Sequence, residues 1–355
     1  MTAADVRGER VECVDLSVRF SRFALGPLNV TLGAGEFFCL LGPSGSGKST
    51  FLGLLGGWVT PQSGRIVIGS RDVTREPAHR RPSRACFQST GYLFPHMTVA
   101  ENVGFALRMK RASEAVVAAR VDELLERVGL SRLRNARSTE LSGGEAQRVG
   151  IARALADLQP LLLLDEVQAS LDRRLRGEIR NLIVELASEH GLTACFVTHD
   201  SAEALALASR LSSRVGVLQD GNFAQIAYAH EIYYRPTSSY VARMTGEINI
   251  LRLRGHEPGW VVTSGGMRIP SRMPAAGNER FVAFRPETVS VTREPTDGGV
   301  PVNVSSVEFF GNRYRIHFRD GDNAFFVEQS SHAGTPSHGP AHLVFDPETV
   351  WVLAE

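Results

Sequence analysis

The chain has 355 residues, of which 43% are hydrophobic and 22% charged, and its formal net charge is +1. This length suits two domains, the composition is that of a globular protein with sizeable cores, and the balanced charge excludes attraction to nucleic acid by bulk charge. No stretch reaches the roughly 18 apolar residues of a membrane span, residues 1–12 are polar and the four cysteines are far apart, so we expect a two-domain cytosolic protein without a secretory signal, zinc site or disulfides.

The first segment predicts strands. Val11–Phe20 and Leu28–Leu32 are partly alternating apolar runs. Glu36–Leu41 is a short, mostly apolar run followed at once by a glycine-rich turn, which is typical of a buried parallel strand. An apolar-faced helix is predicted to begin near Phe51.

The middle of the chain predicts helices. One covers Val99–Lys110, and another begins after Ser113, a plausible N-cap, and ends at Gly129. Apolar residues recur at helical spacing in the second helix, at Val116, Val117, Val121, Leu124, Leu125 and Val128. We interpret this stripe as core packing, and a groove for a partner helix is the alternative.

Two buried strands follow, and polar residues stand at the end of each. Leu161–Leu164 leads into Asp165 and Glu166, and Thr193–Val197 is followed by His199. Strands that alternate with helices and carry polar residues at their carboxyl ends predict an α/β sheet that binds its ligand at those ends.

The texture of the sequence changes near Thr245, where the long helical periods end. We place domains at residues 1–244 and 245–355, and predict that the second is a small β-barrel. Its strand candidates are Val282–Val291, Val300–Phe310, Tyr314–Phe318 and Ala324–Val327.

The second domain contains a short internal repeat. Phe284–Val291 and Phe345–Val352 agree at six of eight positions, with Pro-Glu-Thr-Val in both. A repeated turn followed by a strand predicts two similar corners in one β domain. Chance agreement of turn chemistry is the alternative.

A glycine-rich loop, Gly42-Pro-Ser-Gly-Ser-Gly-Lys-Ser49, stands between a predicted strand and a predicted helix. The pattern G-x-x-x-x-G-K-[ST] is typical of a loop whose backbone N–H groups surround nucleotide phosphates. We predict that Lys48 bridges the β- and γ-phosphates and that the Ser49 hydroxyl ligates Mg²⁺. The motif alone does not separate an ATPase from a GTPase or a small-molecule kinase.

The acidic pair Asp165 and Glu166 fits the same chemistry. In a protein with such a loop, an aspartate at the end of a buried strand holds Mg²⁺. The next residue can then orient and deprotonate the attacking water. A pair of acidic residues that cap a helix is the alternative.

The segment Leu141–Arg148 carries the most specific pattern, a helix start with one serine and two glycines that can receive an anion. It resembles the signature motif of the ATP-binding cassette (ABC) ATPases. Four further positions resemble motifs of that family in the family's order, namely Phe20 (adenine stacking), Gln88 (Q-loop), Ser170–Asp172 (D-loop) and His199 (switch histidine).

The resemblance covers essentially the whole chain. It implies an α/β P-loop ABC ATPase domain with a helical subdomain at about residues 89–160, followed by a small all-β, OB-like domain of the TOBE type. It also implies a head-to-tail homodimer with two ATP molecules between the chains. The implied partners are transmembrane permease subunits and, indirectly, a solute-binding protein, but no nucleic acid. The implied location is the cytoplasmic face of the membrane.

The resemblance also implies roles for single residues. Glu166 is the general base, His199 and Gln88 assist it, and Mg²⁺ is held by Ser49, Asp165 and Gln88, the last directly or through water. The residues implied to bind ATP are Phe20, Gly42, Pro43, Ser44, Gly45, Ser46, Gly47, Lys48, Ser49, Thr50 and, across the dimer interface, Ser142, Gly143, Gly144 and Glu145.

Within the family the chain looks most like importer ATPases, and residues 77–82, 94–99, 101–103 and 245–250 resemble the spermidine/putrescine branch. An importer ATPase for ferric iron, sulfate or sugar is the alternative, followed by a soluble ABC ATPase without a transport role. The chain departs from the usual pattern in four places. They are one extra residue after Gln88, Val167 in place of proline, a longer segment at 210–220, and Glu145 where glutamine is frequent.

Overall fold

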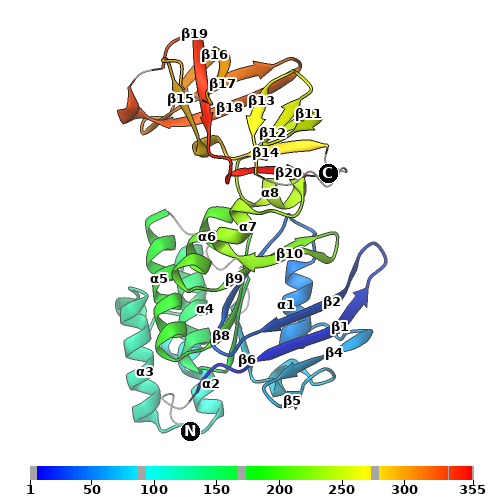
Figure 1. Ribbon diagram of the computed structural model, residues 1–355. Coiled ribbons are helices and arrows are strands. Elements are labelled where there is room, and N and C mark those ends of the chain that lie inside the picture. Colours follow the sequence, from blue (N-terminus) through cyan, green and yellow to red (C-terminus); the bar gives the residue numbers. More distant parts are fainter. Residues whose placement is uncertain are drawn as a thin grey trace. The chain divides into compact units, whose positions relative to one another are not determined.

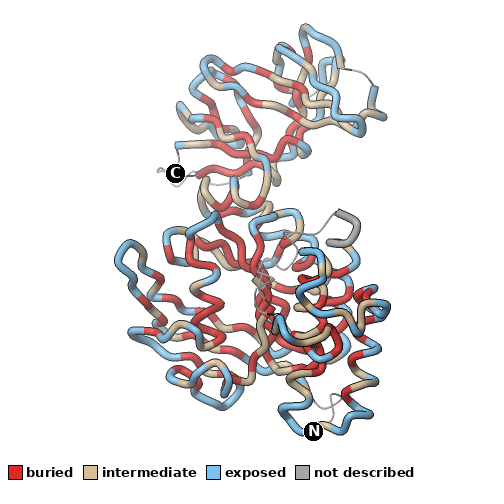
Figure 2. The backbone as a smooth tube through the Cα atoms, turned by 180° about the vertical axis from the view of Figure 1, so that it is seen from behind, coloured by how far each residue is buried: buried red, intermediate tan, exposed pale blue. Residues whose placement is uncertain are grey.

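The structure is a computed structural model that describes residues 6–86, 93–165, 173–272, 280–296, 298–334 and 336–353. The chain divides into two compact units, Met1–Ala229 and His230–Glu355, whose elements are labelled in Figure 1. This division precedes the change of sequence texture at Thr245 because two short helices belong to the second unit. The domain limits 1–244 and 245–355 stay a prediction. Figure 2 shows that the most buried backbone lies inside each unit.

A six-stranded sheet forms the centre of the first unit, in the order β10-β9-β3-β8-β7-β6. Its strands are β3 (Phe37–Leu41), β6 (Ser83–Cys86), β7 (Leu161–Asp165), β8 (Thr193–Thr198), β9 (Arg214–Gln219) and β10 (Asn222–Tyr228). All pairs are parallel except that of β9 with β10. Every residue of β3 and β8 is buried, as expected for parallel strands covered on both faces.

A second, antiparallel sheet has the order β2-β1-β4-β5. Its strands are β1 (Val11–Arg19), β2 (Ala24–Leu32), β4 (Ser63–Ile68) and β5 (Arg71–Asp72). Buried residues alternate with more exposed ones over much of β1 and β2, so that one face joins the same core as Phe38 and Leu40 of β3. The first unit therefore has the expected mixed α/β architecture.

Helices follow the strands of the first unit. They are α1 (Lys48–Gly56), α2 (Val99–Met109), α3 (Glu114–Arg127), α4 (Gly143–Ala156), α5 (Arg173–Glu189) and α6 (Ser201–Arg210), with 3-10 turns at Ala78–Arg80, Ser131–Leu133 and Ser138–Glu140. Helices α2, α3 and α4 pack against one another. Among the described residues, no helix is long and apolar enough to cross a membrane.

The predicted helix after Ser113 is confirmed with one correction. The Ser113 side chain accepts from the backbone N–H of Val116, and Gly129 follows the helix with a φ of 67°. The predicted stripe is buried except for Val116, which is 56% exposed. Val116 lies in the first turn and adjoins Val117, so the two side chains point in different directions and only Val117 reaches the core.

In its described residues, the second unit contains two short helices and two five-stranded antiparallel sheets. The helices are α7 (Ala229–Tyr234) and α8 (Ser239–Thr245). The first sheet has the order β13-β12-β11-β14-β20 and the second the order β15-β19-β16-β17-β18. The strands are β11 (Asn249–Glu257), β12 (Trp260–Thr263), β13 (Arg268–Pro270), β14 (Phe281–Phe284), β15 (Val289–Thr292), β16 (Val300–Phe309), β17 (Arg313–Asp320), β18 (Asn323–Ser330), β19 (Gly339–Phe345) and β20 (Val350–Leu353), with 3-10 turns at Pro286–Thr288 and Ser331–Ala333. One apolar core, including Val282, Phe318 and Leu343, joins both sheets.

The predicted single strand Val282–Val291 is wrong. The 3-10 turn Pro286–Thr288 divides it into β14 and β15, which belong to different sheets. Proline has no N–H for a ladder and favours the start of a helical turn, so the chain leaves one sheet at this point and enters the other.

The two copies of the repeat pair with each other. Phe284 of the first copy pairs with Val350 of the second, and Val289 of the first pairs with Phe345 of the second. The rings of Phe284 and Phe345 meet edge to face, with centroids 5.1 Å apart. The predicted pair of similar corners is confirmed. The pairing is reciprocal, because the start of each copy pairs with the end of the other.

Arg285 binds the two short helices to the β sheets. The side chain is fully buried, and its guanidinium donates to the carbonyl oxygens of Ala242 and Glu247 at 3.0 Å each. It also donates to the Tyr233 carbonyl at 2.9 Å and to the Thr245 hydroxyl at 2.8 Å. These bonds explain why α7 and α8 belong to the second unit.

Candidate functional site

The glycine-rich loop joins β3 to α1, as predicted. Gly47 is the N-cap of α1 and has a φ of 107°. Residues other than glycine rarely adopt this backbone conformation. A Cβ atom there would lie 2.6 Å from Leu25 Cδ1 and 2.7 Å from Phe23 Cζ. Gly45 also has a positive φ, 82°, but a Cβ atom there would meet no atom of the described residues within 4 Å. The backbone conformation therefore favours glycine at 47, and an added Cβ atom would also have to displace the ends of the Leu25 and Phe23 side chains.

Two polar side chains are buried within this loop. Lys48 is 6% exposed, and its Nζ donates to the carbonyl oxygens of Gly42 at 2.8 Å and Pro43 at 2.9 Å. The Ser46 hydroxyl is buried and has no hydrogen-bond partner among the described residues. A buried hydroxyl without a partner is unfavourable unless a ligand pairs with it. The loop therefore fits a phosphate-bearing ligand.

The strand register brings three predicted site segments to one edge of the sheet. Leu41, which directly precedes the loop, pairs with Thr198 on β8. Asp165, the last residue of β7, pairs with Val197 on the same strand. The loop, Asp165 and the residue after Thr198, which is His199, therefore lie at the carboxyl edge of three adjacent parallel strands. This is where α/β sheets bind their ligands.

The backbone around His199 is held by hydrogen bonds. The Thr198 hydroxyl donates to Glu203 at 2.9 Å and accepts from the Asp200 N–H at 3.1 Å. The Asp200 carboxylate accepts from the Glu203 N–H and so caps α6. The His199 side chain is exposed and so is accessible to a ligand at this edge.

Three of the predicted motifs lie outside the described residues. Gln88, Glu166 and the segment Ser170–Asp172 fall in the ranges 87–92 and 166–172. Their adjoining elements are described, because β6 ends at Cys86 and β7 ends at Asp165. Their roles stay predictions.

The segment that resembles the signature motif forms the exposed start of α4. Ser142 is the N-cap, and its hydroxyl donates to the Glu145 carboxylate at 2.7 Å. The same carboxylate accepts from the Ser142 N–H at 2.9 Å, and the Ser142 hydroxyl oxygen accepts from the Glu145 N–H at 3.4 Å, which together form a capping box. The two bonds that Ser142 donates to the carboxylate lower the pKa of Glu145 below its ordinary value, the bond from the hydroxyl contributing most. A Cβ atom at Gly143 would meet no atom within 4 Å in the part of the chain that the structure describes.

Phe20 provides an exposed aromatic surface, as its predicted stacking role requires. The side chain is 47% exposed, in the turn between β1 and β2. Its N–H donates to the Phe23 carbonyl at 2.7 Å, which closes the turn. Phe23 in turn lies beside Gly47 of the phosphate loop.

A cavity of about 470 Å³ lies at the start of α2, lined by His96, Met97, Glu101, Phe105 and Arg108. Its wall is organised by buried Asn102, whose side chain accepts from the Phe94 N–H at 2.8 Å and donates to the Phe94 carbonyl at 3.1 Å. The Phe94 ring packs on Phe105 with centroids 4.6 Å apart. In the sequence, the only signal for this role of Asn102 is its place one turn into a capped helix.

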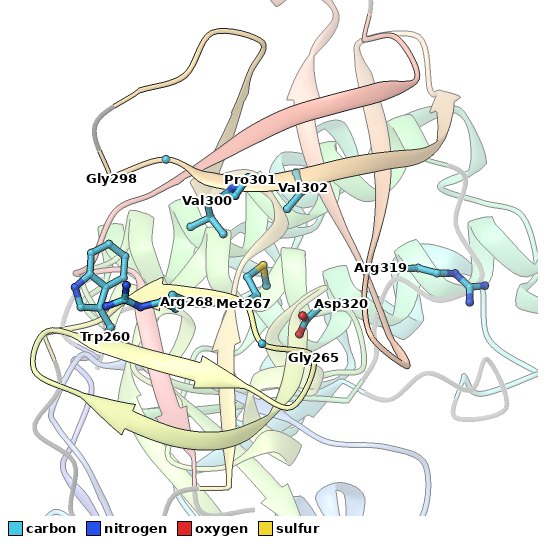
Figure 3. Close-up of a pocket in the computed structure, with 12 residues that line it drawn as sticks. Trp260, Gly265, Met267, Arg268, Gly298, Val300, Pro301, Val302, Arg319 and Asp320 are labelled. Carbon is cyan, nitrogen blue, oxygen red and sulfur yellow. The ribbon is translucent and has the colours of Figure 1, made fainter.

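A second cavity of about 470 Å³ lies within the C-terminal unit. Figure 3 shows Trp260 beside Arg268 at one end, and Asp320 near Gly265 and Met267. The guanidinium of Arg268 lies 5.2 Å from the Trp260 ring centroid and is paired with Glu257 at 2.7 Å. The strand pattern in the sequence did not indicate this cavity, because its lining comes from four separate stretches of chain.

Comparisons with known proteins agree with this geometry. Residues 25–169 match the family described as ABC transporter, and residues 282–353 match the TOBE domain. A spermidine/putrescine import ATP-binding protein of Mesorhizobium japonicum is 37% identical over 316 residues, which cover 87% of this chain and 85% of that protein. The chain belongs to the ABC transporter ATP-binding proteins. The putrescine transport ATP-binding protein of Escherichia coli is 34% identical over 332 residues, covering 89% of this chain and 87% of that protein.

A solved structure supports the ABC ATPase fold. It is a dimeric structure of a post-hydrolysis state of the ATP-binding cassette MJ0796 bound to ADP and Pi, and it is 31% identical with a TM-score of 0.55. The likeness covers 62% of this chain and 98% of that one. The expected fold, a P-loop ABC ATPase domain followed by a small TOBE-type β domain, is confirmed. This ABC protein is an ATP-hydrolysing ATPase.

Proposed function

We propose that this ABC ATPase powers the import of polyamines through a membrane permease. The observation that carries the proposal is the register that places the phosphate loop, Asp165 and His199 at one sheet edge. The solute class is supported by the names of the relatives, which are spermidine/putrescine and putrescine import proteins. The cytoplasmic face of the membrane is the location that this function requires.

ATP fits the loop as its nucleotide. Backbone N–H groups of Gly42–Thr50 and the Lys48 ammonium bind the phosphates, and the buried Ser46 hydroxyl gains a partner. Phe20 stacks on the adenine ring, since its exposed ring has a free face and its turn adjoins the loop.

Mg²⁺ fits the chemistry of the predicted oxygen donors. The Ser49 hydroxyl and the Asp165 carboxylate would hold it, with Gln88, which lies outside the described residues, as a further ligand, and Mg²⁺ prefers few protein oxygens together with phosphate and water. When bound, the ion supplies positive charge that offsets the charge of the phosphates.

Glu166 is the general base in this proposal. It directly follows Asp165, so its carboxylate can accept a proton from the water that attacks the γ-phosphate. His199 contacts the γ-phosphate and helps to align that water, and the hydrogen bonds of Thr198 and Asp200 keep its backbone in place.

Two copies of the chain share each ATP in this proposal. The exposed N-terminus of α4, with Ser142, Gly143 and Gly144, is available to close on the γ-phosphate held by the other copy. The dimeric state of the MJ0796 structure supports this arrangement.

The permease is proposed to insert a helix at the cavity beside α2. The cavity combines apolar Met97 and Phe105 with charged Glu101 and Arg108, which suits the end of an amphipathic helix. The first residue that lines the cavity, His96, follows the segment 87–92 in the sequence, and this segment contains Gln88. Through this connection, occupation of the cavity and the state of the ATP site can influence each other.

Transport in vesicles tests the whole proposal. The chain is purified with the permease encoded beside it, reconstituted with the accompanying solute-binding protein, and supplied with ATP and labelled putrescine, spermidine, ferric iron, sulfate or maltose. We expect ATP-dependent uptake of a polyamine that is lost in Lys48→Ala. Uptake of another solute alone would overturn the polyamine assignment, and a reconstituted complex that takes up none of these solutes with ATP would overturn the transport role.

A further inference from the structure

We propose that Asp157 is a positioning residue that fixes the helices α2 and α4 to the central sheet. The inference rests on the ATPase function proposed above but concerns residues that this function does not use. Asp157 directly follows α4, and its side chain is only 6% exposed. It forms ion pairs with two cations, Arg84 and Lys110, from two other segments of the chain.

Each partner belongs to a different element. Lys110 is the C-cap of α2, and its Nζ lies 2.7 Å from Asp157 Oδ1. Arg84 lies on β6, where it pairs with Leu162 of β7, and its guanidinium contacts the other carboxylate oxygen. Gln159 also donates to Asp157, at 3.4 Å. One carboxylate thus joins the end of α2, the end of α4 and a strand of the sheet.

The placement of Asp157 is unfavourable without these partners. A carboxylate after the last turn of a helix faces the negative end of the helix dipole. Arg84 and Lys110 reverse the local potential, and Arg120 adds a third cation by donating to the Leu155 carbonyl at 3.0 Å. A neutral side chain would end the helix as well without requiring any of them.

Stability alone does not explain such a cluster. Removing charges from water offsets most of the attraction within a buried ion pair, and the best-supported role of such pairs is to select one arrangement. Here the arrangement selected is the orientation of α2 and α4 against β6. Lys110 is 53% exposed, so its pair with Asp157 can break and re-form at lower cost than the Arg84 pair, in which Arg84 is 30% exposed.

The orientation of α4 against β6 matters because each of these two elements adjoins a segment proposed for ATP chemistry. α4 begins at Ser142, and β6 ends at Cys86, two residues before Gln88. We infer that the Asp157 cluster sets where the signature segment stands relative to the sheet that carries the phosphate loop. Loss of the Lys110 contact should therefore leave nucleotide affinity unchanged and lower turnover.

Distances between spin labels test the inference without using ATP hydrolysis. Labels are placed at Val116→Cys on α3, which packs with α2, and at Arg65→Cys on β4, both exposed. The four native cysteines are buried, and burial raises the pKa of the Cys86 thiol to about 12, so the labels react selectively with the new thiols. In Lys110→Gln and Asp157→Asn we expect a distance distribution at least about twofold broader than in the parent chain.

Matched variants separate the cluster from a general charge effect. Arg10→Gln removes a cation that pairs with nearby Glu12, outside α2, α3 and α4, and should leave the distribution unchanged. Lys110→Arg keeps the charge and should restore the narrow distribution. Because Asp157→Asn leaves Arg84 without its partner and can lower stability, Lys110→Gln is the deciding variant. An unchanged distribution in Lys110→Gln would overturn the inference.

ATP hydrolysis provides the second measurement. We expect Lys110→Gln to bind ATP within about twofold of the parent affinity and to turn over several-fold more slowly at saturating ATP. Equal turnover in the two chains would reduce the cluster to a structural role. A parent chain that hydrolyses no ATP would instead overturn the proposed function, while the distance measurement would still decide the role of Asp157.

Discussion

Gly47 and Lys48 show how a single residue type is required by its surroundings. Gly47 combines a left-handed backbone with a position where an added methyl group would have to displace the side-chain ends of Leu25 and Phe23. Lys48 is buried because two carbonyl oxygens of its own loop accept its hydrogen bonds. The loop therefore holds its shape through its own backbone, as a site for a highly charged ligand needs.

Gly47→Ala should destabilise the chain more than Gly45→Ala. Both substitutions place alanine at a positive φ, but only the first adds contacts under 3 Å, so the difference should be at least about 1 kcal/mol in the free energy of unfolding. Denaturant unfolding of the two variants measures it. Equal values would show that the contacts with Leu25 and Phe23 relax without strain.

Glu166→Gln should retain ATP binding and slow hydrolysis by at least about 10²-fold, within the range for loss of a positioned base. The amide keeps the shape of the side chain but cannot accept the proton. Calorimetry gives the affinity and phosphate release gives the rate, with Glu189→Gln as a control on an exposed carboxylate of α5. Hydrolysis at the parent rate would remove Glu166 from this role.

At the scale of elements, helix caps and strand register determine which side chains lie at the candidate ATP site. The strongest contributions are local, since Ser113 and Ser142 each begin a helix through a side-chain bond to the backbone. The start of α4 depends on Glu145 as well, because its carboxylate accepts from both the hydroxyl and the N–H of Ser142.

The first turn of α4 should loosen in acid. The bonds from Ser142 lower the pKa of Glu145 below its ordinary value of 4.5, so the cap stabilises the folded state above that value and is lost as the pH falls through the lowered pKa. Amide exchange in this turn, followed from about pH 6 to about pH 3, measures the effect. Glu145→Gln keeps an acceptor without a titrating group, so its exchange should lack this component. The same pH profile in the parent and Glu145→Gln would assign the loosening to another group.

Sequence reasoning succeeded where the determinants are contiguous. The phosphate loop, the caps at Ser113 and Gly129 and the buried strands that end at Asp165 and Thr198 follow from short patterns. The meeting of the loop, Asp165 and His199 was predictable, because adjacent parallel strands share a carboxyl edge. Prediction from the sequence failed where residues far apart in the chain decide the structure. The Asp157 cluster joins residues 73 positions apart, and the break at Pro286 depends on a second sheet that accepts the strand.

At the scale of the whole molecule, the two units differ in what holds them together. The first has a mostly parallel sheet with helices and a smaller antiparallel sheet, and the second a core shared by two antiparallel sheets. The residues proposed for ATP chemistry, from Phe20 to His199, lie in the first unit. The bonds of Arg285 to Tyr233 and Ala242 assign the short helices to the second.

A chain that ends at Ala229 should fold and bind ATP with an affinity close to that of the full chain. A chain that ends at Met244 should be less soluble, because it retains α7 and most of α8 without Arg285 and the β sheets that cover them. Calorimetry with ATP and light scattering on both chains make the comparison. If the shorter chain is folded but cannot bind ATP, the C-terminal unit contributes to the nucleotide site.

The crossed pairing of the two repeat copies makes the C-terminal unit an interlocked assembly. Phe284 pairs with Val350, and Val289 pairs with Phe345, so each sheet contains strands from both copies and neither copy can complete a sheet alone. A cut at the exposed turn Gly321–Asp322 would divide the C-terminal unit into two parts, neither of which can complete its sheets alone but which are complementary to one another. Co-expressed, such fragments should reassemble. For the same reason, two intact chains could exchange their last two strands, β19 and β20. The resulting dimer would be domain-swapped rather than held by surface contact.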